Sequence, residues 1–341
     1  MITTNRDKLL LFTGAGFSHS IASSLLTTPD FYEKHIKGND GVRYHDYLKT
    51  LLGDNMDAEN FAQRMYRIAR ALGELARDNE GDREYISLRV TGHSTGDLCI
   101  QDFRKEILED LKYINSTVLH ELDCRSLTPD AEKKVADCQE FLKKLNLKFN
   151  FNIFSTNYDN LIRHINEKNH GYYLCRKNGT LGVVDKDKLV NEGVPYSYIP
   201  LKGMLDWRRQ GDLIVQGLEF KNDLADSVIL PLEYTAVIGN NQEPHSTFYS
   251  RLEEELRSAG FWVFIGFSFR DLYINSMIRR VASSSSPTKI LIITKIGNEE
   301  EYKKFQKDRG VIFSNCVNPV WMNEGFDKKS QQAILKQLAA G

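Results

Sequence analysis

The sequence lacks the features that mark several classes of protein. Its cysteines are odd in number, widely spaced and without a Cys-x-x-Cys pair, so we expect neither a four-cysteine zinc module nor a disulfide framework. The formal net charge is −1, so the chain has no overall basic field of the kind that non-specific nucleic-acid binding requires, and we expect no direct nucleic-acid binding. The cysteines are Cys99, Cys124, Cys138, Cys175 and Cys316.

Long apolar runs are also missing. Stretches such as FWVFIGF are far shorter than the roughly 20 apolar residues that cross a bilayer as a helix. The opening residues MITTNRDK have no apolar core of the kind found in secretory signal peptides. We therefore expect a soluble, cytoplasmic protein with no membrane partner.

Short apolar runs bounded by turn residues are present and mark candidate strands. Most of them are apolar on successive residues rather than on alternate ones, which is typical of strands covered on both faces. This pattern predicts an α/β fold, a Rossmann-like and mostly parallel sheet flanked by helices. The runs are 8–14, 149–157, 196–203, 227–231, 261–268, 289–295 and, less regular than the others, 310–315.

The segment between the first two runs is far too long for a plain connection and has helical periodicity. We expect it to form a helical insertion subdomain, over residues 30–148, within a single domain of residues 1–341. Such an insertion can cover a binding site. The predicted helices of the chain are 61–78, 97–122, 129–145, 245–260, 271–284 and 329–339.

Small and hydrogen-bonding residues follow four of the predicted strands, and ligands of doubly wound sheets bind at the carboxyl ends of the strands. The glycines of GAGFS would let a phosphate approach backbone N–H groups at a helix start, and Ser18 and Ser268 can donate hydrogen bonds. Asn157 carries a donor and an acceptor, so it can hold a ribose hydroxyl and orient a water. The four segments are 14–18, 155–159, 202–207 and 266–271.

Each of these segments also has an ordinary structural explanation. A Gly-x-Gly turn after a strand is often only a tight connection, and Asp159 and Asp271 can serve as caps of the helices that follow them. The combination of four such strand ends favours a ligand site. The Gly-x-Gly-x-x-Gly fingerprint is absent, since His19 stands where its third glycine would be, and this disfavours a hydride-transferring dehydrogenase.

Four segments, in the order FTGAGFS, FSTNYDNLI, LKGMLDW and VFIGFSFRDLYINSMI, resemble the bacterial sirtuin-like domains associated with anti-phage defence. The resemblance spans almost the whole chain. It implies an NAD-binding domain with a helical insertion, and many members of the family hydrolyse the nicotinamide–ribose bond of NAD and so cause abortive infection. It also implies homo- or hetero-oligomers with other defence proteins. Protein deacetylation is disfavoured, because the deacetylating relatives carry a four-cysteine zinc module.

The resemblance assigns residues to roles. Asn157 would hold the nicotinamide ribose and position a water, Asp159 would support this loop or contact the ligand, and Asp271 would cap the following helix. The glycine turn and Ser18 would cradle the pyrophosphate, while Gly266 and Ser268 would bind the adenosine half. The implied nucleotide-binding residues are Gly14, Ala15, Gly16, Phe17, Ser18, Thr156, Gly203, Gly266, Ser268 and Asp271.

One residue departs from the family pattern. The family usually has a histidine before the glycine of its third motif, where it acts as general base, and this chain has Lys202. An ordinary lysine holds its proton at neutral pH and is a poor base. Its cation would also oppose the positive charge of the nicotinamide ring and of the departing ribose, whereas it would suit a triphosphate.

Several hypotheses remain open from the sequence. The chain is an NAD glycohydrolase in which Asn157 and binding geometry suffice, or in which His19, His164 or His245 replaces the missing base. Alternatively it is a pseudoenzyme that binds a nucleotide through the glycine turn and Lys202 and senses or scaffolds beside an active partner. A third hypothesis is a nucleotide-dependent oligomerisation module. None of them calls for a metal ion.

Overall fold

The computed structural model divides the chain into two compact units, which are described separately. One unit comprises residues 1–25 and 122–341, and the other comprises residues 26–121. The described residues are 7–25, 27–37, 61, 65, 68–69, 85–90, 93–121, 126–165, 173–177, 181–185, 196–204, 207–210, 213–216, 243–285 and 287–340.

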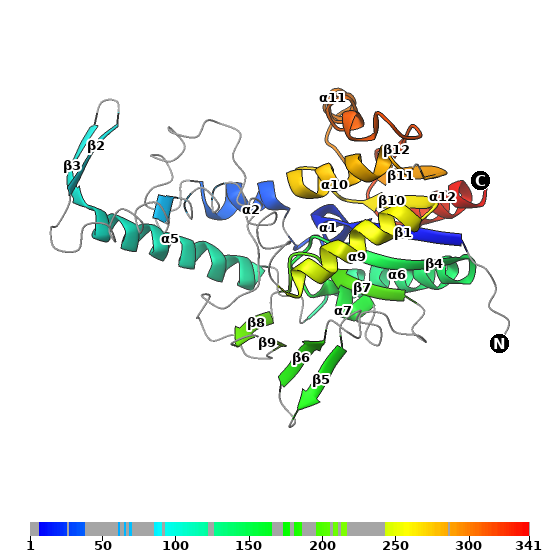
Figure 1. Cartoon of the computed structure of the whole chain (residues 1–341), viewed down its shortest axis with the longest axis horizontal. Coiled ribbons are helices and arrows are strands. Elements are labelled where there is room, and N and C mark those ends of the chain that lie inside the picture. The colour runs from blue at the N-terminus through cyan, green and yellow to red at the C-terminus, as the bar shows by residue number, and fades with distance from the viewer. Residues whose placement is uncertain are drawn as a thin grey trace. The chain divides into compact units, whose positions relative to one another are not determined.

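A six-stranded parallel sheet forms the centre of the first unit (Figure 1). Its order is β12-β11-β10-β1-β4-β7, so the first strand of the chain lies in the middle, between β10 and β4. Counted along the chain, this is the 3-2-1-4-5-6 order of dinucleotide-binding Rossmann folds, which confirms the predicted fold class. The strands are β1 (Asp7–Thr13), β4 (Phe149–Ser155), β7 (Tyr196–Pro200), β10 (Phe261–Ile265), β11 (Lys289–Ile293) and β12 (Val320–Met322).

Helices cover both faces of this sheet. The right-handed crossovers β1–β4–β7 and β10–β11–β12 run in opposite directions from the centre, so their helices lie on opposite faces. On one face α6 contacts α1, α7 and α12, and on the other α10 contacts α9 and η3. The bounds are α1 (Ala15–Ile21), α6 (Pro129–Lys148), α7 (Leu161–Ile165), α9 (His245–Ser258), α10 (Leu272–Ala282), α11 (Glu299–Gly310), η3 (Val311–Phe313) and α12 (Lys328–Ala339).

Aromatic and aliphatic side chains fill the space between sheet and helices. All five residues of β10 are buried, as expected for a strand covered on both faces. Phe326, just before α12, packs against Phe17 of α1 and Phe141 of α6, with ring centroids 5.1 and 5.4 Å away. This aromatic contact joins three helices on one face of the sheet.

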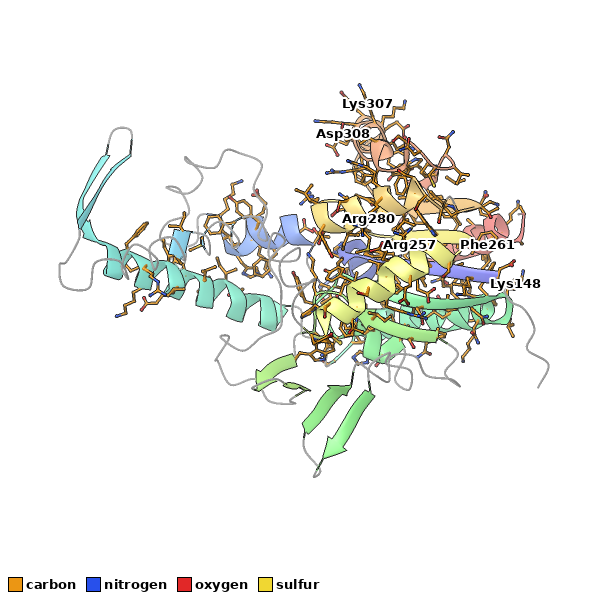
Figure 2. The ribbon with its side chains drawn as sticks, viewed as in Figure 1. Lys148, Arg257, Phe261, Arg280, Lys307 and Asp308 are labelled. Atoms are coloured by element: carbon orange, nitrogen blue, oxygen red, sulfur yellow. The ribbon has the colours of Figure 1, made fainter. Side chains whose placement is uncertain are left out.

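Outside the core, ion pairs join neighbouring helices. Figure 2 shows Arg257 on α9 and Arg280 on α10, and a guanidinium nitrogen of each lies 2.6 Å from a carboxylate oxygen of Glu253. The same figure shows Lys148 and Phe261 at the amino edge of the sheet, the edge opposite to the predicted site.

Two further groups of elements complete the described structure. A four-stranded antiparallel sheet of order β5-β6-β9-β8 lies within the first unit, and the second unit contains a β2–β3 hairpin together with helices. The bounds are β5 (Tyr173–Lys177), β6 (Leu181–Asp185), β8 (Trp207–Gln210), β9 (Leu213–Gln216), α2 (Thr28–His35), β2 (Tyr85–Val90), β3 (His93–Cys99) and α5 (Ile100–Glu121). No helix in the described ranges combines the length and the apolar character that crossing a membrane requires.

The structure corrects one expectation about the elements. The predicted strand 310–315 is wrong, because Val311–Phe313 form a 3-10 turn whose Ile312 and Phe313 are buried while Val311 is exposed. The sixth strand is instead β12, which is only three residues long. The predicted strand 227–231 lies outside the described residues, as does most of the predicted helix 61–78.

The second compact unit differs in extent from the predicted insertion. The prediction gave residues 30–148, whereas the unit comprises residues 26–121. The difference arises from α6, which contacts α1, α7 and α12 and therefore belongs to the first unit. The β2–β3 hairpin also adds strands to a segment that was expected to be helical.

Candidate functional site

The turns after β1 and β10, the two central strands, are held against each other. The N–H of Gly14 donates to the carbonyl of Ile265 (3.0 Å), and that of Gly16 donates to the carbonyl of Gly266 (3.1 Å). A Cβ on Gly14 would lie 2.6 Å from the Gly266 carbonyl oxygen. The switch point of the sheet, where ligands of this fold bind, is thus built from two turns in backbone contact.

Gly266 is the most restricted of these glycines. Its φ of +62° is rarely adopted by residues with a side chain, and an added Cβ would lie 2.1 Å from the backbone nitrogen of Phe17. The glycines at this switch point are therefore required by contact between the two turns. Whether they also admit a phosphate stays a prediction.

Asn157, two residues beyond β4, reaches across to the β1–α1 turn. Its Nδ2 donates to the carbonyl of Gly14 (3.0 Å) and to Ser18 Oγ (2.7 Å). The side chain is buried, and among the described residues its Oδ1 has no hydrogen-bond partner. A buried amide oxygen without a partner is costly, and this atom has room in its hydrogen bonding for one more donor.

Asp159 is joined to Asn157 through Ser18. The Ser18 hydroxyl donates to the Asp159 carboxylate, and the N–H of Leu161 donates to Asp159 Oδ1 (3.1 Å) at the start of α7. Burial raises the pKa of Asp159 to about 6, against the opposing effect of these hydrogen bonds. Asp159 therefore caps the start of α7. Its carboxylate is also linked to the side-chain amide of Asn157 through the hydroxyl of Ser18.

Lys202, at the position of the family histidine, is buried and lies beside another buried charge. Its Nζ is 3.7 Å from Asp271 Oδ2, and the two side chains are only 4% and 2% exposed. Asp271 Oδ1 accepts hydrogen bonds from the N–H groups of Tyr273 and Ile274, so this residue caps α10. The Nζ of Lys202 also lies 5.8 Å from the centre of the Tyr158 ring. The lysine thus lies next to the Asn157 loop.

Tyr249 belongs to this cluster and was not predicted from the sequence. It lies on α9, and burial together with the nearby Asp271 raises the pKa of its hydroxyl well above the usual value. That hydroxyl is buried and, in the described part of the chain, has no hydrogen-bond partner. In the sequence Tyr249 belongs to the apolar face of an amphipathic helix, and this pattern predicts only that the residue packs in the core.

The remaining predicted residues lie around the same edge of the sheet. Ser268 is exposed, Thr156 is half-buried, and Gly203 has a φ of +81° in the turn after Lys202. Ala15 and Phe17 belong to the first turn of α1, and Phe17 is buried against Phe326. The structure thus gathers the four predicted strand-end segments at one edge, except Leu205 and Asp206, which lie outside the described residues.

The three histidines considered as substitute bases have different surroundings. His19 is in the last turn of α1, and its Nδ1 lies 2.8 Å from the carbonyl oxygen of Leu25. His164 is half-buried on α7. His245 is fully buried, and its Nδ1 lies 3.0 Å from the carbonyl of Leu201, the residue before Lys202.

No metal site emerges from the described residues, where no group of three or more His, Cys, Asp or Glu side chains is arranged to hold an ion. Burial raises the pKa of the Cys138 thiol. The expectation that the protein uses no zinc stays a prediction.

Two solved structures are similar to the chain, one titled as the structural basis of sirtuin substrate affinity and one as the structural basis for the mechanism and regulation of Sir2 enzymes. The first is 9% identical, covers 98% of this chain and 95% of its own, and has a TM-score of 0.38. The second is 10% identical, covers 98% and 94%, and has a TM-score of 0.41. No curated protein matches the chain in sequence.

The model of the SIR2-like domain family matches residues 152–313. This range includes Asn157, Asp159, Lys202, Gly266 and Asp271, and so covers three of the four strand-end segments. Residues 152–313 are thus similar to the SIR2-like domain family, which the motifs of the chain also resemble.

Proposed function

We propose that the protein binds NAD at the carboxyl edge of its parallel sheet and hydrolyses it to nicotinamide and ADP-ribose. The observation that carries the proposal is the buried Asn157 Oδ1, which has no hydrogen-bond partner within the described ranges, on a side chain whose Nδ2 makes two hydrogen bonds to the β1–α1 turn. In this proposal Oδ1 accepts a hydrogen bond from a ribose hydroxyl or from the attacking water. Because Nδ2 is engaged by Gly14 and Ser18, the orientation of the amide is fixed before the ligand arrives.

The charge around Asn157 suits this reaction. Breaking the bond between nicotinamide and ribose leaves positive charge on the ribose. With a pKa of about 6, Asp159 is ionised at neutral pH, and its carboxylate lies one hydroxyl group away from Asn157. A carboxylate in a buried site stabilises a nearby developing cation. No residue is required to remove a proton before the bond breaks, so the absence of the family histidine does not prevent cleavage.

The test is incubation of the purified protein with NAD and chromatography of nicotinamide and ADP-ribose. We expect Asn157→Ala to lower the rate by about 100-fold or more, a loss typical of removing one preorganised group. Asn315→Ala is the matched control, because Asn315 is exposed and bonds to Ser283 at the end of α10, on the opposite side of the sheet. Turnover retained in Asn157→Ala contradicts the proposal.

The second candidate function is a nucleotide-binding pseudoenzyme, and the observation that favours it is Lys202 in place of the family histidine. In that case the wild-type protein binds NAD in calorimetry without releasing nicotinamide. Lys202→His would then confer or strongly raise cleavage.

The biological setting belongs to the same proposal. A protein that depletes NAD in the cytoplasm, as an oligomer or beside other defence proteins, would limit phage growth through abortive infection. The support is the similarity of the four motifs to defence-associated sirtuin-like domains. Expression with and without phage challenge, followed by measurement of cellular NAD, tests this role.

A further inference from the structure

The turn between β10 and α10 contains two residues with a left-handed backbone. Gly266 directly follows β10 and has a φ of +62°, and Phe269 has a φ of +52°. Glycine adopts such values freely, whereas a phenylalanine adopts them only when its surroundings outweigh the steric cost. Residues held in this way are concentrated at ligand-binding sites, so the contacts that hold Phe269 bear on function.

Two kinds of contact hold Phe269 in place. Its ring is fully buried, and its carbonyl oxygen accepts a hydrogen bond from Nδ2 of Asn275 in α10 (2.7 Å). Packing therefore fixes the side chain, while the hydrogen bond from Asn275 fixes the backbone. The neighbouring ring centroids lie 4.7 Å (Phe267), 5.2 Å (Phe264) and 5.6 Å (Phe313) from that of Phe269.

Asn275 is a buried amide on the apolar face of its helix. It is only 6% exposed, and its Oδ1 has no hydrogen-bond partner in the part of the chain that the structure describes. A leucine has nearly the same shape and would not bury an unpaired oxygen, so an amide is the costlier residue here. What the amide adds, and an apolar residue cannot, is the hydrogen bond from Nδ2 to Phe269.

The conformation of Phe269 determines the direction of Ser268. Phe267 and Phe269 are buried, whereas Ser268 between them is exposed at the carboxyl edge of the sheet. The ring of Phe269 is anchored in the core, and the chain enters α10 two residues later, at the cap Asp271. A rotation about φ of Phe269 would therefore turn Ser268 away rather than move the helix.

We propose that Asn275 is a positioning residue for nucleotide binding, because its hydrogen bond to Phe269 holds the turn with Ser268 facing the adenosine half of the ligand. The inference rests on the proposed function in taking NAD as the ligand, and on Ser268 as the residue that contacts the adenosine half. Asn275 acts through the backbone of the turn and does not touch the nucleotide. Every ligand that carries the adenosine half should depend on it.

The first test is Asn275→Leu in the full chain, with binding of NAD and of ADP measured by calorimetry. ADP carries the adenosine half without the nicotinamide, so we expect both affinities to fall alike, by about 10-fold. Asn315→Leu makes the same chemical change at an exposed residue near the other end of α10 and should bind both ligands within about 3-fold of the wild type. Unchanged affinity in Asn275→Leu, or a loss for NAD alone, overturns the inference.

The second test is a double-mutant cycle with Ser268→Ala, which separates positioning from a general loss of structure. Ser268 is exposed, so its substitution should leave folding intact. We expect Ser268→Ala to weaken ADP binding by about 10-fold and the double variant to weaken it no further, since Asn275 acts through Ser268. A structural defect unrelated to Ser268 would weaken binding equally in both backgrounds. An additive loss of about 100-fold, or no effect of Ser268→Ala, overturns the inference.

Folding of the variants is checked by thermal unfolding without ligand. Leucine favours the helix more than asparagine does, and this offsets part of the lost hydrogen bond, so Asn275→Leu should melt close to the wild type. If its extra methyl group prevents folding, Asn275→Ala removes the same amide without added bulk and is expected to give the same losses and the same cycle.

The two proposals can fail separately. A wild type that binds ADP but not NAD contradicts the proposed function, and the cycle is then measured with ADP. A wild type that hydrolyses NAD, beside an Asn275→Leu variant of unchanged affinity, overturns the inference alone. A wild type that binds neither nucleotide overturns both.

Discussion

At the scale of single residues, Asp159 combines a structural and an electrostatic role. It caps the start of α7, accepts the Ser18 hydroxyl, and has its pKa raised to about 6 by burial. The same carboxylate that favours a cation near Asn157 is therefore costly to ionise in the folded protein.

This cost predicts a pH dependence of stability. Between the ordinary pKa of 3.8 and the folded pKa of about 6, the folded protein keeps a proton that the unfolded chain has lost. The contribution of Asp159 to the free energy of unfolding therefore falls as pH rises through this window, by about 3 kcal/mol in total. Asp159→Asn lacks this titration, so its stability relative to the wild type should rise between pH 4 and 6 and level off above. Unfolding curves from pH 4 to 8 measure it, and a difference independent of pH contradicts it.

The sequence predicts that some of these residues lie close together, but it does not predict all of the contacts among them. Asn157, Ser18 and Asp159 lie at the ends of strands that have clear apolar runs, so topology alone brings them together. The pairing of Lys202 with Asp271 depends on the chain crossing from one edge of the sheet back to its centre. No local sequence pattern reveals that crossing. From the sequence, Lys202 was expected to suit an anionic ligand, whereas in the structure it lies beside the carboxylate of Asp271.

At the scale of elements, the site is built on the contact between the β1–α1 and β10–α10 turns. The backbones of these turns are hydrogen-bonded to each other. They lie so close that a methyl group added to Gly14 or Gly266 would clash with the backbone of the opposite turn. The second turn also holds Phe269 at a φ of +52°, buried among aromatic rings, with Asn275 Nδ2 donating to its carbonyl (2.7 Å). A strained residue of this kind persists only where its surroundings hold it.

We predict that Gly266→Ala destabilises the protein by several kcal/mol, because its Cβ would clash with the backbone of Phe17 and its φ is unfavourable. Gly310→Ala is the matched control, since an added Cβ there meets nothing within 4 Å and the residue has helical dihedral angles. The control should be neutral or up to about 1 kcal/mol more stable. Thermal unfolding of both variants measures the effect. Equal stability of the two would show that the turns can separate.

Elements were predicted with uneven success, and their side chains explain why. The strands of the main sheet are continuously apolar because both faces are covered, so they stand out in the sequence. The strand β12 has only three residues, all half-buried. The strand β8, with sequence WRRQ, carries two arginines and has no apolar run. Short or polar strands of this kind owe their conformation to their partners rather than to their own sequence.

At the scale of the whole molecule, β1 depends on residues from the far end of the chain. Leu9–Thr13 pair in parallel with Phe261–Ile265, and the core of the first unit includes side chains from both ends of the chain. A chain that ends at Gly260 lacks β10, β11 and β12 and leaves one side of β1 unpaired.

We therefore expect a chain of residues 1–260 to show no cooperative thermal unfolding transition in circular dichroism. A chain of residues 1–327 lacks only α12, with its buried Ile334 and Leu338, and should unfold cooperatively at a lower temperature than the full protein. A cooperative transition in the shorter chain would contradict the central role assigned to β1.

The central position of β1 has a consequence for biosynthesis. This apolar strand leaves the ribosome before both of its partners, because Leu9 pairs with Phe151 on one side and with Phe261 on the other. Until those partners are synthesised, the apolar strand β1 is unpaired on the growing chain, and parallel pairing between residues so far apart in sequence is slow. The protein should therefore depend on chaperones while it is being made and gain soluble yield when translation is slowed by cold.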